Sequence, residues 1–206
     1  MTNEITTARA RSLSRNSALP NLDRQLSVEV LLARLGQVNM ISFTTSIPDA
    51  SFLARNSREL QRVREQVDAG PDANLLLSLV ENTTDALQTD PDPKVTAVAV
   101  ALLFDSRARQ PANPITYLSI LCSDLVRLGF QPAVVAAACQ RLRETTAFIP
   151  EICEVIEACR KVQLQYRATA RMASLVLQTR MEAVAAIREA ESLPPPARKP
   201  RDCGGW

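Results

Sequence analysis

Apolar and small residues recur in steps of three and four along most of the chain, which is the spacing of one face of an α-helix. The pattern is clearest after Pro150, where neither Gly nor Pro interrupts it between Glu151 and Leu193. We therefore expect one helix of about 40 residues, about 60 Å long at 1.5 Å per residue. Arg180 interrupts its apolar face, which consists of Ile152, Val155, Cys159, Val162, Tyr166, Thr169, Ala173, Val176, Ala183 and Ile187.

A helix of this length cannot be covered from end to end by a small body. Its far half must pack on a partner, on another copy of itself, or on helices from the N-terminal part of the chain. The spacing is also typical of a coiled coil, although Ala, Thr and Arg at seam positions weaken that interpretation. The pattern therefore predicts a long helix that serves as a docking arm or associates with a second copy.

Shorter amphipathic segments precede the long helix, and start and stop signals separate them. Proline suits a first helical turn, where its missing N–H would have no partner, and glycine suits the position after the last turn. Six helices are expected. The first runs from near Asp23 to Gly36, the second from Ser46-Ile47-Pro48-Asp49 to Gly70-Pro71, and the third from Asp72 to Gln88. The fourth begins after Asp90-Pro91-Asp92-Pro93, the fifth runs from Asn113-Pro114 to Gly129, and the sixth begins at Gln131-Pro132. The segment from Val95 to Leu103 is nearly all apolar, which predicts a central, buried helix.

A corner joins the last of these helices to the long one. Pro150 pushes the preceding residue toward extended geometry, so the chain must turn there. Glu151 and Glu154 then lie near the positive end of the new helix, where carboxylates are favoured. We expect the apolar Phe148 and Ile149 to be buried, pinning the incoming helix to the outgoing one as a hydrophobic staple does.

The composition supports one all-α domain with appendages. The chain has 206 residues, of which 46% are hydrophobic and only 5 are glycine, and long strand-like alternation is missing. We predict a multi-helix bundle with a long C-terminal helix and disordered termini. Its parts are a disordered basic arm (1–22), N-terminal helices (23–70), a compact core with the corner (71–160), an extended helix (161–193) and a disordered tail (194–206).

The net charge of +2 creates no global field that would attract nucleic acid, so DNA contact would need local clusters of basic residues. Such clusters could follow single-stranded DNA or an acidic partner. Ordinary solvation is the alternative, because Glu157 is spaced to pair with basic residues on the same helix. The candidate contacts are Arg9, Arg11 and Arg15 in the arm, and Arg160, Lys161, Arg167 and Arg171 on one side of the long helix.

The chain lacks the residues of common catalytic and metal sites. It has no histidine, which removes the commonest general base and the commonest metal ligand. Its five cysteines form no C-x-x-C pair, and four of them lie on apolar helix faces, where cysteine acts as a small hydrophobe. No G-x-x-x-x-G-K-[ST] loop is present. We expect no enzymatic activity, no metal and no cofactor.

The expected environment is the cytoplasm. The longest apolar run, Val95 to Phe104, is far shorter than the roughly 20 residues that span a bilayer. An odd number of cysteines and the lack of a signal sequence indicate a reducing compartment. We therefore expect a soluble cytoplasmic protein that does not contact a membrane.

Residues 113–160 contain one helix, a second helix that opens with a proline and an apolar pair, and a corner of the form F-x-P-x-x-x-E-[IVL]. This arrangement resembles the phage-type replicative helicase loader/inhibitor family, whose members are small, helical and without an ATPase of their own. The corner positions are matched by Phe148, Pro150, Glu154 and Val155. Tyr117 lies where the preceding helix of the family often carries an aromatic residue.

The resemblance implies a phage or prophage replication accessory that binds the host or phage replicative helicase and helps load it on DNA. In the family a flexible C-terminal part is thought to engage the helicase, whereas here a long helix precedes only a short tail. Two other functions remain open: a DNA-binding accessory or regulatory protein that uses the arginines, and a helical scaffold that self-associates through the long helix. For the corner itself, a generic helix-start staple is the alternative.

Overall fold

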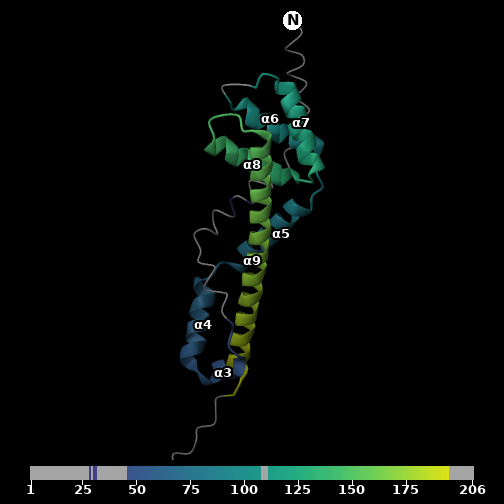
Figure 1. Ribbon diagram of the computed structural model, residues 1–206. Helices are drawn as coiled ribbons and strands as arrows, with labels where there is room; N and C mark the ends of the chain where they lie inside the picture. Colours follow the sequence, from purple (N-terminus) through teal and green to yellow (C-terminus); the bar gives the residue numbers. More distant parts are fainter. Residues whose placement is uncertain (1–27, 29, 32–45, 108–110, 195–206) are drawn as a thin grey trace, which may run out of the picture. The chain divides into compact units, whose positions relative to one another are not determined.

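The computed structural model describes residues 28, 30, 31, 46–107 and 111–194, and every element in this part of the chain is helical (Figure 1). The all-α prediction is thus confirmed. The predicted arm (1–22), the tail from residue 195 onward and most of the helix predicted between Asp23 and Gly36 lie outside the described residues. The helices are α3 (Ala50–Arg55), α4 (Ser57–Ala69), α5 (Ala73–Gln88), α6 (Pro93–Asp105), α7 (Pro114–Arg127), α8 (Pro132–Thr145) and α9 (Ile152–Ser192).

The chain forms two compact units, each built from two separate segments. Among the described residues, the first unit takes 28, 30, 31, 78–107 and 111–172, and the second takes 46–77 and 173–194. Helices α5 and α9 therefore contribute residues to both units. The divisions predicted from the sequence fall after residues 22, 70, 160 and 193, whereas the two units divide the described residues after residues 77 and 172.

The predicted long helix is confirmed as α9, which runs for 41 residues. Its apolar face is buried at the predicted spacing of three and four residues. The side chains that are almost completely buried are Val155, Cys159, Val162, Tyr166, Ala173, Val176, Ala183 and Ala190. The first four of these belong to the first unit, and the other four belong to the second.

The core of the first unit lies between α6, α7, α8 and the first half of α9. Helix α8 is its most buried element, because every residue from Pro132 to Cys139 is buried. Its short alanine run lets neighbouring helices approach closely, since the distance between helix axes depends on the side chains at the contact. Helix α6 packs against both α7 and α8, but Leu102 on its outer side is 42% exposed. The nearly all-apolar segment is thus partly exposed, and the more alanine-rich helix is central.

Helix α6, which contains the longest apolar run, has 13 residues. Among the described helices, none combines the length and the apolar character needed to cross a bilayer.

The predicted helix ends are confirmed in the first unit. Helices α6, α7 and α8 each begin with the expected proline. After α7, Gly129 has a φ of +76°, a left-handed conformation that suits glycine. Its N–H donates to Val126 O at 3.0 Å, and the N–H of Phe130 donates to Leu125 O at 3.2 Å. These two hydrogen bonds form a Schellman motif. The motif commonly has apolar residues at the positions of Phe130 and Leu125, and both are buried here.

The single helix predicted between Pro48 and Gly70 is wrong, because the chain breaks at Asn56 and forms α3 and α4 instead. Asn56 has φ −124° and ψ 85°, and its Oδ1 accepts a hydrogen bond from the Glu59 N–H at 3.2 Å. An asparagine side chain competes with the helix for backbone N–H groups and is therefore favoured at a helix start. The segment Asn56-x-x-Glu59 carries this signal inside a pattern that otherwise predicts one helix.

In the second unit, helices from the N-terminal part of the chain pack against the second half of α9. This was one of the three possibilities that the sequence left open for that half. Val63 and Val67 are buried on α4, and Arg64 of α4 forms an ion pair with Glu191 of α9. Arg180, which interrupts the apolar face, donates from Nη1 to the carbonyl oxygen of Val67 at 2.5 Å.

Candidate functional site

The corner between α8 and α9 brings together three of the residues singled out from the sequence. The hydroxyl of Tyr117, on α7, donates to the carbonyl oxygen of Pro150 at 2.5 Å. Its ring also packs against Phe104 of α6, with the ring centroids 5.1 Å apart. The pKa of Tyr117 is raised from 10 to about 12, mainly by burial and then by the nearby Glu154, Cys153 and Glu151. The phenol therefore stays protonated and can donate over the whole neutral range.

The start of α9 is stabilised by a side-chain cap. Helix α9 begins at Ile152, so Glu151 precedes its first residue, and the N–H of Glu151 donates to Glu154 Oε2 at 2.7 Å. This is one half of a capping box, and it places the carboxylate at the positive end of the helix as predicted. Pro150 and Val155 are buried beside it. The cap and the buried neighbours together hold the corner in one conformation.

Arg107 holds the other side of the corner, and sequence analysis missed this role. Its guanidinium donates to Leu142 O at 2.8 Å and to Thr146 Oγ1 at 3.0 Å, and it also donates to Thr146 O. These groups belong to the end of α8, where carbonyl groups lack partners within the helix. The available signal was an arginine placed directly after the end of α6, a place where it can reach the end of a neighbouring helix.

The predicted burial of Phe148 is wrong, since its side chain is 77% exposed. The staple is made instead by Ile149, which packs against the core, and by the buried Pro150. The two residues after Phe148 take the inner positions of the corner, so the phenyl ring is left on the outside. An ordered corner that presents a phenylalanine to solvent is therefore the main feature of this site.

A groove of about 360 Å³ lies between the end of α8 and the start of α9, next to the corner. Its apolar part is formed by Leu142, Ala158 and Val162, and the rest is charged or polar. The lining consists of Arg141, Leu142, Thr145, Glu154, Glu157, Ala158, Lys161 and Val162. Glu154 thus belongs both to the cap of α9 and to the rim of the groove.

The basic residues predicted on one side of the long helix are all exposed. Lys161 lies 3.8 Å from Glu157, as the sequence spacing predicts for a surface pair. Arg160, Arg167 and Arg171 form no such pair with any described residue. The other candidate contacts, Arg9, Arg11 and Arg15, lie outside the described residues.

The buried cysteines behave as packing residues rather than reactive groups. The pKa of Cys139 is raised to about 12, mainly by burial and then by the neighbouring Cys122, whereas Arg143 opposes the shift. Burial, and then Cys139, also raise the pKa of Cys159. Cys153 is exposed at the corner. Within the described part of the chain, no group of three or more Cys, Asp and Glu residues is arranged to hold a metal ion.

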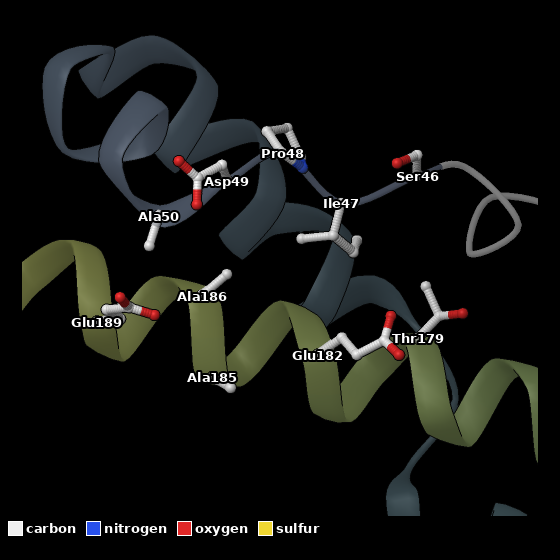
Figure 2. A pocket seen from close by; sticks show the side chains of 10 residues that line it. All are labelled: Ser46, Ile47, Pro48, Asp49, Ala50, Thr179, Glu182, Ala185, Ala186 and Glu189. Atoms are coloured by element: carbon white, nitrogen blue, oxygen red, sulfur yellow. The ribbon is translucent and has the colours of Figure 1, made fainter.

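A second cavity, of about 450 Å³, lies in the second unit between residues 46–50 and the end of α9 (Figure 2). Glu182 and Glu189 extend from α9 on the side that faces Asp49, and Ala185 and Ala186 lie between them. Three carboxylates that surround small side chains give the cavity an acidic rim.

Comparison of this chain with models of protein families, with curated proteins and with solved structures finds no match.

Proposed function

We propose that this chain is a non-catalytic helical adaptor of phage or prophage DNA replication, which binds the host or phage replicative helicase through the corner between α8 and α9 and helps load it on DNA. The observation that carries the proposal is the 77% exposure of Phe148 in a corner that several hydrogen bonds fix. The same residue belongs to the motif on which the resemblance to helicase loaders is based.

The exposure of Phe148 supports an interface role for the motif over a generic staple. A generic staple stabilises a helix start by burying its apolar residue, and here Ile149 and Pro150 already serve that purpose. An exposed phenylalanine adds nothing to the core. Large aromatic side chains that are held in place on a surface are typical anchors of protein interfaces, where they fill a pocket of the partner.

The surroundings of Phe148 also favour a protein partner. The adjacent groove offers an apolar floor of Leu142, Ala158 and Val162 inside a charged rim. An apolar core with a polar rim is the usual anatomy of an interface patch. A helicase surface that accepts Phe148 would place one of its own apolar side chains in this groove.

The test is a binding measurement with purified replicative helicase from the host, identified first as the hexameric protein captured from host lysate. Replacing Phe148 by Ala removes the anchor, so we expect affinity to fall by about tenfold or more, as for an interface hot spot. Phe52→Ala is the matched control, because Phe52 is also exposed, at 49%, but lies on α3 in the second unit. Its affinity should equal that of the unmodified protein.

Two outcomes contradict the proposal: no replicative helicase is captured, or Phe148→Ala binds it as tightly as the unmodified protein. Deleting residues 194–206 provides a second comparison. If the corner is the contact, the deletion leaves helicase affinity within about twofold, whereas engagement through the tail abolishes it.

A further inference from the structure

The outer face of α9 in the first unit carries a row of exposed residues that faces away from the core. Arg160, Leu164, Arg167 and Arg171 follow one another in steps of four, three and four residues, which keeps them on one side of a helix. All four are exposed, and Leu164 is 64% exposed. The buried Val162 and Tyr166 occupy the opposite side of the same turns.

The three arginines of this row have no ion pair with any residue that the structure describes. Glu157 is close in sequence to Arg160, yet it pairs with Lys161 at 3.8 Å. Two other arginines of the first unit are engaged: Arg127 lies 3.1 Å from Asp124, and Arg107 donates to the end of α8. The row is therefore a concentrated positive charge that the described part of the chain leaves uncompensated.

Apolar side chains accompany the arginines. Leu164 stands between Arg160 and Arg167, and Met172, which is 42% exposed, follows Arg171. A leucine that lies two-thirds exposed among cations gains by contact with another apolar surface. A phosphate backbone offers no such surface, and the row contains no aromatic side chain on which a base could stack. These features favour a protein over a nucleic acid.

A second copy of this face is a poor partner for it. A two-fold symmetric contact between two identical faces would bring the arginines of one copy toward those of the other. Like charges placed across an interface oppose association. The complementary surface must instead carry carboxylates around an apolar stripe.

We propose that the face formed by Arg160, Leu164, Arg167, Arg171 and Met172 binds an acidic amphipathic helix of a partner protein. The partner's apolar side chains contact Leu164 and Met172, and its Glu or Asp residues pair with the three arginines. Recognition of this kind uses anchors spaced at helical intervals. The proposal goes beyond the helicase contact, because it concerns residues other than those of the corner and does not depend on Phe148.

The test uses a fluorescent synthetic peptide of about 20 residues, long enough to form a helix, with leucines on one face and glutamates flanking them. A scrambled peptide of the same composition, without that face, serves as the reference probe, and single-stranded oligothymidine is the nucleic-acid probe. We expect the triple variant Arg160→Gln, Arg167→Gln, Arg171→Gln to bind the amphipathic peptide about tenfold more weakly, since each surface pair contributes modestly.

The matched control removes three other exposed arginines and so gives the same net charge: Arg58→Gln, Arg143→Gln, Arg188→Gln. Peptide affinity should remain within about twofold of the unmodified protein in this control, because screened charges away from the contact matter little. Leu164→Ser, a change that removes no charge, should also lower the affinity for the amphipathic peptide several-fold.

Three results would overturn the proposal. In the first, the two triple variants weaken peptide binding equally, so that only net charge matters. In the second, Leu164→Ser has no effect on peptide affinity. In the third, oligothymidine binds and loses affinity in the first triple variant while the peptide does not bind, which assigns the face to nucleic acid.

Discussion

Arg180 donates to the backbone carbonyl of Val67, 2.5 Å away within the second unit. Val67 lies in the last turn of α4, where carbonyl groups have no partner within the helix. The arginine that interrupts the apolar face of α9 therefore completes the end of the helix packed beside it. A break in the hydrophobic pattern corresponds here to a specific contact.

Replacing Arg180 by Leu should destabilise the second unit even though it restores the apolar pattern. The change leaves the Val67 carbonyl without its charged donor, and hydrogen bonds to charged groups contribute about 1.5–3 kcal/mol. Urea denaturation should show a loss of about 1–2 kcal/mol. Arg188→Leu on the exposed side of α9 is the control and should change the unfolding free energy by less than about 0.5 kcal/mol. Equal or higher stability of Arg180→Leu would contradict the role of this contact.

Truncation of Phe148 and of Phe130 to Ala should lower the free energy of unfolding by very different amounts. Phe148 is 77% exposed and Phe130 is 4% exposed. Removing an exposed ring leaves no cavity, so Phe148→Ala should change the free energy of unfolding by less than about 0.5 kcal/mol. Phe130→Ala should cost about 3–5 kcal/mol, the usual loss for a buried phenylalanine. Thermal or chemical denaturation of both variants measures the difference, and a large loss in Phe148→Ala would show that the ring is buried.

Stability should decrease at high pH because of Tyr117. Burial is the main cause that raises its pKa from 10 to about 12, and the neighbouring Glu154, Cys153 and Glu151 add to it. Because the pKa is raised in the folded state, the contribution of the protonated tyrosine to the free energy of unfolding is complete below about pH 10. This contribution is lost as the pH rises through about 12. Deprotonation of Tyr117 also removes the hydrogen that its hydroxyl donates to the carbonyl oxygen of Pro150.

Tyr117→Phe separates this effect from general alkaline unfolding. The variant should be less stable at neutral pH by about 1 kcal/mol, because a hydrogen bond is lost. Between pH 10 and 12 its stability should fall less steeply than that of the unmodified protein. Parallel pH profiles of the two proteins, measured by denaturation, would contradict the assignment.

The cysteines should differ in reactivity according to their burial. Only a thiolate reacts with alkylating reagents, and burial raises the pKa of Cys139 to about 12 and also raises that of Cys159. In the folded protein at neutral pH, the exposed Cys153 should be alkylated first. Cys139 and Cys159 should react only after unfolding. Mass spectrometry of peptides from a Cys203→Ser variant measures the order, and early labelling of Cys139 would contradict it.

Much of the fold could be predicted because proline and glycine mark helix ends for local reasons. Pro114 and Pro132 begin helices since a first-turn N–H needs no partner, and Gly129 ends one since it adopts a positive φ. The break at Asn56 was missed for the opposite reason. It depends on a side-chain hydrogen bond to Glu59, which competes with a helical pattern that continues on both sides.

The candidate site could be predicted only in part. The contact of Glu154 follows from its position three residues after Glu151, the residue that precedes α9, whereas Tyr117 and Pro150 are joined by a hydrogen bond between residues far apart in the chain. Phe148 remains outside the corner, whereas Ile149 packs against the core and Pro150 is buried. Composition predicts burial for both residues, and only the packed structure decides which of them remains outside.

The contacts that hold the corner are made mostly to main-chain atoms. Arg107 donates to the carbonyls of Leu142 and Thr146, Tyr117 donates to the carbonyl of Pro150, and Glu154 accepts from a backbone N–H. Such contacts persist when most neighbouring side chains are exchanged. The outward residues of this corner can therefore change one at a time without loss of the frame that presents them.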